Sequence, residues 1–115
     1  MTFTVARVYD PPADDGGARV LVDRLWPRGL AKADAHVDLW LKEVAPSTDL
    51  RKVFHHDPDL FPEFTRRYRA ELDANPAVDQ LRELEREHGT VTLLYGAKDT
   101  EHNQAVVLRD YLTGG

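Results

Sequence analysis

The chain has 115 residues, and none of them is cysteine. It therefore forms no disulfide, uses no thiolate nucleophile and holds no metal or iron–sulfur cluster through cysteine ligands. Five histidines are present, but the adjacent pair His55 and His56 matches no metal-binding spacing such as His-Glu-x-x-His. We accordingly expect a protein that needs no metal and no cofactor.

Long apolar stretches are absent as well. No run approaches the roughly 20 residues that a membrane-spanning helix requires, and residues 1–7 lack the basic-then-apolar pattern of a signal sequence. We expect a soluble, cytoplasmic protein that does not act at a membrane. Basic charge is also scarce, because 15 Lys and Arg face 20 Asp and Glu, for a net charge of −5. This balance disfavours a general nucleic-acid coat protein, although it allows a local basic cleft.

The length predicts a single domain over residues 1–115. Residues 3–9 are rich in β-branched and aromatic types, which favours a strand. The short apolar runs 18–22 and 91–95 are typical of central strands that are buried on both faces. Alternation over 36–42, with Val37, Leu39 and Leu41 on one face, favours a fourth, half-buried strand, and a helix stays open as the alternative over so few residues.

Helices are expected between and after these strands. Ser47 is a candidate N-cap for a short helix that runs to Phe54. Asp59 is the expected cap of the next helix, and the last helix is expected to be capped by Asp99 or Thr100. Helical spacing of apolar residues marks the core positions of the long middle helix, which are Phe61, Phe64, Tyr68 and Leu72, with Arg66 and Arg69 in solvent. The pattern predicts the α/β class: a small single domain with about four strands in a mostly parallel sheet, covered by helices.

Polar side chains follow both central strands, over residues 23–29 and 95–103. Ligands of open α/β sheets bind at the carboxyl ends of strands, so we expect the two segments to lie side by side and to form an anion site. Arg24 and Arg28 would clamp a phosphate or carboxylate, and the turn before the last helix would add positive potential. The candidate ligand-binding residues are Asp23, Arg24, Trp26, Arg28, Tyr95, Lys98, Asp99, His102 and Asn103.

Structural roles for the same residues stay open at this point. Asp23 can pair with Arg24 or Arg28, Trp26 can fill the edge of the core, and Asp99 can be an ordinary cap. His55 and His56 are candidate catalytic residues, since a histidine near the arginines could move a proton near neutral pH. A histidine that only binds carbonyls at a helix end is an equally good interpretation.

Three long motifs carry a resemblance to a known family. They are Arg19–Gly29 (RVLVDRLWPRG), Phe54–Pro58 (FHHDP) and Leu93–Asp99 (LLYGAKD), the last followed by His102–Ala105 (HNQA). The chain resembles the bacterial YeaO-like family, domain of unknown function 488, over nearly its whole length. The resemblance implies a small cytosolic α/β domain and brings no established activity with it.

A larger branch of that family carries cysteines at the positions of Tyr95 and Asn103, and a histidine at the position of Gln104. This chain has none of the three. Thiol or metal chemistry of that branch is therefore not expected here.

Three functions remain in view. The first is a site for an anionic or nucleotide-like small molecule, with or without catalysis, in which Trp26 or Tyr95 stacks on a ring. The second is nucleic-acid binding in a local basic cleft, and its cations would be Arg19, Arg24, Arg28, Lys32 and Arg66. The third is a non-catalytic interaction module in which Trp26 and Trp40 are exposed and anchor a partner protein.

Overall fold

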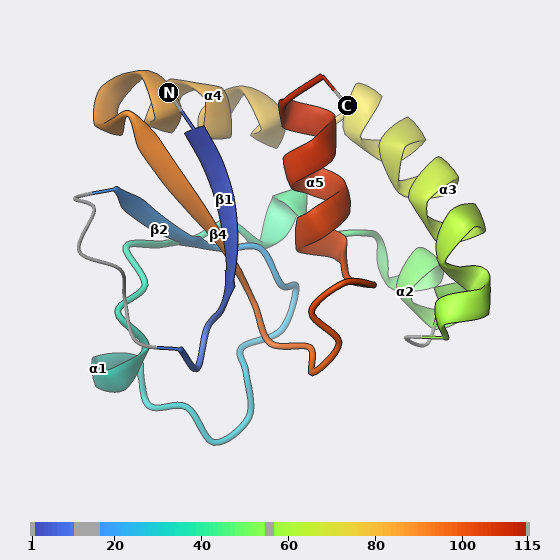
Figure 1. Cartoon of the computed structure of the whole chain (residues 1–115), viewed down its shortest axis with the longest axis horizontal. Coiled ribbons are helices and arrows are strands. Elements are labelled where there is room, and N and C mark those ends of the chain that lie inside the picture. Colours follow the sequence, from blue (N-terminus) through green and yellow to red (C-terminus); the bar gives the residue numbers. More distant parts are fainter. Residues whose placement is uncertain (1, 11–16, 55–56, 115) are drawn as a thin grey trace.

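A parallel sheet of four strands organises the domain (Figure 1). The computed structural model describes residues 2–10, 17–54 and 57–114. Its strands are β1 (Thr2–Arg7), β2 (Ala18–Leu21), β3 (Leu39–Trp40) and β4 (Thr90–Tyr95), in the order β1-β4-β2-β3. Every pairing among these strands is parallel, so the α/β class and the parallel sheet predicted from the sequence are confirmed.

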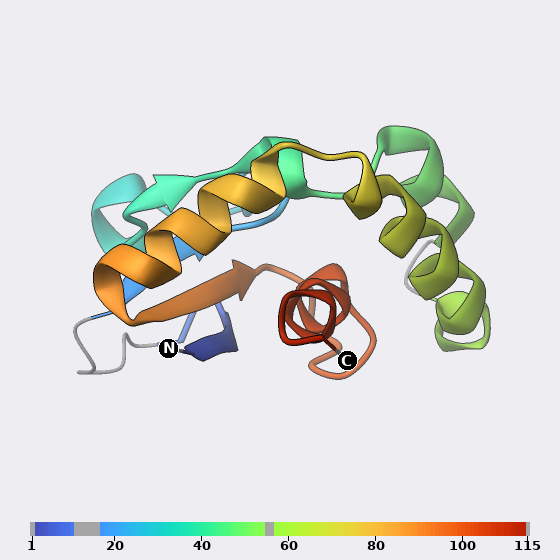
Figure 2. The same cartoon turned by 90° about the horizontal axis from the view of Figure 1, so that it is seen from above.

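The helices lie between and after the strands, as expected, with most of them between β3 and β4. The α-helices are α1 (Lys32–Ala35), α2 (Thr48–Phe54), α3 (Phe61–Asp73), α4 (Ala77–His88) and α5 (Gln104–Leu112), and two 3-10 turns are η1 (Lys42–Val44) and η2 (Pro58–Leu60). Helix α5 packs against β1 and β4, α4 against β4 and β2, and α3 against α5 and α2 (Figure 2). None of the helices in the described ranges is long and apolar enough to cross a membrane.

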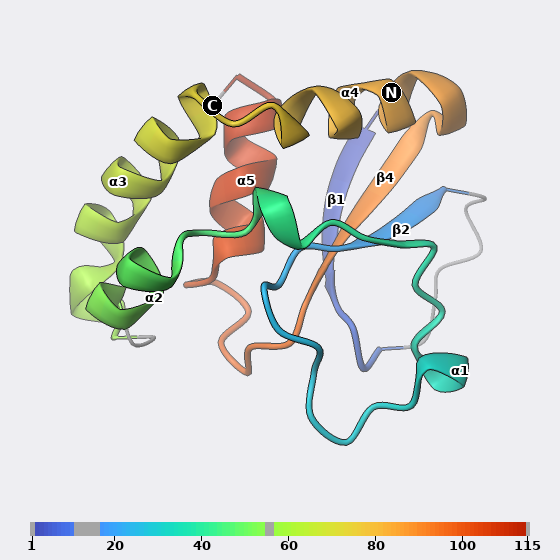
Figure 3. The same cartoon turned by 180° about the vertical axis from the view of Figure 1, so that it is seen from behind.

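The two faces of the sheet are covered by different parts of the chain. Val20 and Leu93 point into the main core, which the helices close, whereas Leu21 and Leu94 belong to a smaller apolar cluster on the other face. Trp26, Leu30 and Val37, from the long connection between β2 and β3, pack against that second cluster. Figure 3 shows the path of this connection after β2. Because both faces are covered, most residues of β2 and β4 are buried, as their largely apolar runs predict.

The apolar stripe of α3 forms the centre of the main core. Phe64, Tyr68 and Leu72 are buried as predicted, whereas Phe61 at the start of the helix is only half-buried. The hydroxyl of Tyr68 donates a hydrogen bond of 2.6 Å to the carbonyl of Val44, so its one polar atom is satisfied inside the core.

Three local predictions are wrong. Leu39 is 38% exposed, because β3 is only two residues long and lies at the edge of the sheet. Asp59 does not cap α3, since Asp57 caps the preceding turn η2 and Leu60 occupies the N-cap position of α3. Helix α5 begins only at Gln104, and its cap is Asn103 rather than Asp99 or Thr100, whose segment forms a separate turn.

Candidate functional site

The segments that follow β2 and β4 meet at the carboxyl edge of the sheet. The carboxylate of Asp23 accepts a hydrogen bond of 2.7 Å from the amide of Gly96, and another from the side-chain amide of Gln104. A Cβ at position 96 would lie 3.1 Å from Oδ2 of Asp23, so the close approach of carboxylate and backbone suits glycine there. The predicted juxtaposition of the two segments is therefore present.

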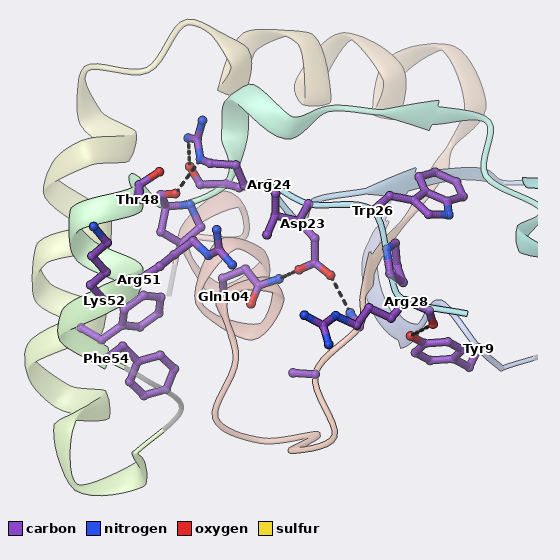
Figure 4. Close-up of a pocket in the computed structure, with 17 residues that line it drawn as sticks. Tyr9, Asp23, Arg24, Trp26, Arg28, Thr48, Arg51, Lys52, Phe54 and Gln104 are labelled. Atoms are coloured by element: carbon purple, nitrogen blue, oxygen red, sulfur yellow. Dashed lines mark hydrogen bonds between the residues drawn. The ribbon is translucent and has the colours of Figure 1, made fainter. Parts of the chain in front are cut away.

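A cavity of about 620 Å³ opens beside this junction (Figure 4). Its walls come from both strand-end segments, from the chain before α2, from α2 itself and from the core face of α3. The residues that line it are Tyr9, Asp23, Arg24, Leu25, Trp26, Pro27, Arg28, Ala45, Pro46, Thr48, Arg51, Lys52, Phe54, Phe64, Gly96, Ala97 and Gln104. Four of these are cationic and one is a carboxylate, so positive charge dominates the lining.

Three of the four cations have no anionic partner among the described residues. Within the part of the chain that the structure describes, the side chains of Arg28, Arg51 and Lys52 form no hydrogen bond or ion pair. Figure 4 shows Arg28 and Arg51 extending into the cavity from opposite sides, with Gln104 between them in this view. The one carboxylate in the lining, Asp23, already accepts two hydrogen bonds from the protein. Because like charges around one cavity repel each other, an anion bound there would be stabilised.

Arg24, the first residue of the predicted clamp, has a different environment. Its Nε and Nη2 donate hydrogen bonds of 3.1 Å each to the carbonyls of Pro46 and Ala45. Part of the guanidinium is thus used to fix the chain just before α2, the helix that carries Arg51 and Lys52. Arg24 lines the cavity and also positions the helix opposite.

The aromatic candidates are tied into the protein. Trp26 is half-buried, donates its indole N–H to the carbonyl of Leu30 at 2.7 Å, and lies edge-on to Trp40 with ring centroids 5.5 Å apart. Trp40 donates its own N–H to the carbonyl of Asp23. Neither tryptophan is an exposed anchor, so that premise of the interaction-module hypothesis is wrong. Tyr95 is buried, burial raises its pKa, and it does not line the cavity.

The remaining candidates of the second segment lie outside the cavity lining. Asp99 accepts backbone hydrogen bonds from Glu101 and His102, and these bonds lower the pKa of its carboxyl. Its second oxygen lies 3.0 Å from Nδ1 of His102, whose ring packs edge-on to Phe61. Lys98 is exposed.

Asn103 is fully buried, and its side chain forms hydrogen bonds to backbone groups that precede and follow it in the chain. Its side-chain oxygen accepts from the amide of Val106, and its NH₂ group donates to the carbonyl of Asp99.

The catalytic candidates His55 and His56 lie outside the described residues. The described ranges contain no group of three or more histidines or acidic residues arranged to hold a metal ion.

Sequence reasoning missed the contribution of α2 to the site. Arg51 and Lys52 appear in the sequence as an ordinary basic pair on a short helix, and only the packing of α2 brings them to the strand-end cavity. Gln104 was missed as well, although it directly follows the predicted segment and its amide bonds Asp23. The only available signal was its place at the start of a helix after a buried strand.

Comparison with known proteins identifies a family that this chain matches over nearly its whole length. The family described as "Inactive DUF488-N3 subclade" matches residues 2–114. The uncharacterized protein YeaO of Escherichia coli (strain K12) is 44% identical over 113 residues, which cover 97% of each chain. The uncharacterized protein Rv3073c of Mycobacterium tuberculosis (strain H37Rv) is 44% identical over 110 residues, 96% of this chain and 92% of the relative. No solved structure matches the chain.

Proposed function

This chain belongs to the inactive DUF488-N3 subclade of the YeaO-like family, and from that premise we propose that it is a non-catalytic domain that binds a small anionic molecule. The site is the cavity between the strand-end segments and α2. The observation that carries the proposal is a set of three cations, Arg28, Arg51 and Lys52, which have no partner within the described ranges and line one cavity of about 620 Å³.

The charge distribution favours an anion rather than a neutral ligand. Guanidinium groups recognise phosphate, sulfate and carboxylate through pairs of parallel N–H donors. Asp23, the one carboxylate among the described lining residues, brings one negative charge against four cations and already accepts hydrogen bonds from Gly96 and Gln104. Arg24 is held to two carbonyls and adds its positive charge at the same wall.

The lining supports binding without catalysis. The one carboxylate among the described lining residues, Asp23, is engaged in hydrogen bonds that join two segments of the fold. A general base needs a titratable group within reach of the ligand. The description of the matching subclade as inactive agrees with this interpretation.

The nucleic-acid alternative draws less support from the arrangement of its cations. Arg19 donates to the carbonyl of His36, Lys32 lies over the ring of Trp26, and Arg66 pairs with Glu63 on the exposed side of α3. None of these three lines the cavity. A groove for a nucleic-acid strand would need them on one continuous surface.

Calorimetric titration with inorganic phosphate tests the proposal. The Arg28→Ala, Arg51→Ala double variant should bind at least about tenfold more weakly than wild type, since a charge-assisted hydrogen bond contributes roughly 1.5–3 kcal/mol. The matched control is Arg66→Ala, Arg86→Ala, which removes two cations that pair with glutamates outside the cavity. Equal affinity of wild type and the cavity variant, or no saturable binding by wild type, would reject the site.

A further inference from the structure

We infer that the ligand of this cavity is an organic phosphate monoester, a phosphate joined to an apolar or aromatic body such as a nucleoside. This inference rests on the proposed anion site and adds what the rest of the ligand must be. Three features of the cavity carry it: its size, the apolar surface that it leaves open, and the number of cations without partners.

The cavity is too large for an inorganic ion alone. Its volume of about 620 Å³ falls in the middle of the range of roughly 300–1,000 Å³ that is usual for organic ligands and cofactors. A phosphate held by Arg28 and Arg51 would leave most of this space to water. A ligand with a body of nucleoside size would use it.

Apolar surface is left open at the same place. Leu25 is 64% exposed and Tyr9 is 42% exposed, and both line the cavity. They are the two most exposed large apolar or aromatic side chains in the described ranges. Both share the cavity lining with Arg28: Leu25 lies three residues before it in the chain, and the hydroxyl of Tyr9 donates to its backbone carbonyl at 3.1 Å. A phosphate held by Arg28 would therefore place an attached apolar body next to Leu25, where burial of that surface is favourable.

The number of free cations favours phosphate over a carboxylate. A phosphate monoester carries close to two negative charges at neutral pH and offers three acceptor oxygens. A monocarboxylate carries one charge and two oxygens. Three unpartnered cations around one cavity are better neutralised by the dianion.

The experiment compares ligands that share the phosphate and differ in the body. Wild-type protein is titrated calorimetrically with inorganic phosphate, phenyl phosphate, adenosine 5′-monophosphate and benzoate. Both organic phosphates should bind about tenfold more tightly than inorganic phosphate, because burial of roughly 60 Å² of apolar surface has that effect. Benzoate should bind more weakly than phenyl phosphate.

A pair of leucine variants tests where the apolar part of the ligand binds. Leu25→Ser should reduce the affinity for phenyl phosphate or adenosine 5′-monophosphate by about three- to tenfold and leave the affinity for inorganic phosphate unchanged. Leu39→Ser is the matched control, since Leu39 is also exposed, at 38%, but does not line the cavity.

The outcomes separate this inference from the anion site itself. Equal affinity for inorganic phosphate and both organic phosphates, or no effect of Leu25→Ser on the organic phosphates, would overturn the inference and leave the anion site standing. Absence of saturable binding for all phosphates would overturn both. Tighter binding of benzoate than of phenyl phosphate would replace the phosphate with a carboxylate and so reject the inference.

Discussion

The carboxylate of Asp23 and the backbone amide of Gly96 are joined by a hydrogen bond of 2.7 Å across 73 positions of the chain. The other carboxylate oxygen accepts from Gln104 at the start of α5. One side chain therefore connects the end of β2, the turn after β4 and the last helix. An acid that looks like a ligand-binding residue in the sequence acts in the structure as the joint on which the cavity is built.

Loss of this joint should destabilise the fold. In Asp23→Ala the amides of Gly96 and Gln104 lose their acceptor, which should lower the free energy of unfolding by about 2–3 kcal/mol. Urea denaturation measures the change, and Asp59→Ala, at an exposed carboxylate, is the control. A loss below about 0.5 kcal/mol, the usual range for surface substitutions, would show that the joint contributes little.

The positioning role of Arg24 leads to a graded prediction. Arg24→Ala should weaken phosphate binding more than Arg24→Lys, because lysine keeps the charge and can still donate to one of the carbonyls of Ala45 and Pro46. Neither variant restores the two-point contact of the guanidinium, so both should also lower stability. Calorimetry and urea denaturation are measured on the same samples, and two variants that both match wild type would contradict the assignment.

The stripe on α3 predicts a large loss of stability on truncation. Phe64 is 1% exposed and stacks on Phe54 with ring centroids 4.3 Å apart. Phe64→Ala should therefore cost about 3–5 kcal/mol. Arg66→Ala on the exposed side of the same helix should stay within about 0.5 kcal/mol. Comparable losses for the two variants in urea denaturation would mean that the stripe is not the core.

Acid should remove the contribution of Asp99. The backbone amides of Glu101 and His102 lower the pKa of this carboxyl in the folded state. Its ionised form thus stabilises the fold above the unfolded carboxyl pKa of about 3.9, and this stabilisation is lost as the pH falls through the lower folded value. Thermal unfolding of wild type and Asp99→Asn should show a difference in Tm at pH 7 that narrows below about pH 4. A difference that is independent of pH would contradict this origin.

Alkaline conditions should act through Tyr68. Burial raises its pKa in the folded state above the ordinary tyrosine value. The protonated hydroxyl therefore stabilises the fold below the unfolded pKa of about 10, and this stabilisation declines as the pH rises above it. Tyr68→Phe should cost about 1–2 kcal/mol at pH 7, since the carbonyl of Val44 loses its donor. The gap between wild type and variant should then shrink between pH 10 and 11; a constant gap would refute the argument.

The parts of the fold that depend on local pattern were predictable from the sequence. Largely apolar runs identify β2 and β4, because a strand that is covered on both faces carries apolar side chains on both of them. Helical spacing identifies the buried residues of α3. The edge strand β3 was harder to predict. Apolar and polar residues alternate over 36–42, but only Leu39 and Trp40 pair with β2, and Leu39 faces solvent.

The candidate site was predictable in place but only partly in composition. Parallel neighbouring strands must end at one edge, so Asp23 and Gly96 could be expected to meet. Nothing in the sequence shows that α2 folds back over this edge, and for that reason Arg51 and Lys52 were missed. For Trp26 the sequence left both ligand stacking and filling of the core edge open, and its packing on the second face of the sheet supports the structural role.

The strand order β1-β4-β2-β3 also determines when the protein can fold during synthesis. Strand β4 lies between β1 and β2, so the two N-terminal strands share no direct pairing in the finished sheet. A nascent chain that ends before residue 90 has no partner for β1 and lacks both Gly96 and Gln104. We expect such intermediates to remain sensitive to protease on the ribosome, with both the sheet and the anion cavity forming late, once residues up to the start of α5 have emerged from the exit tunnel.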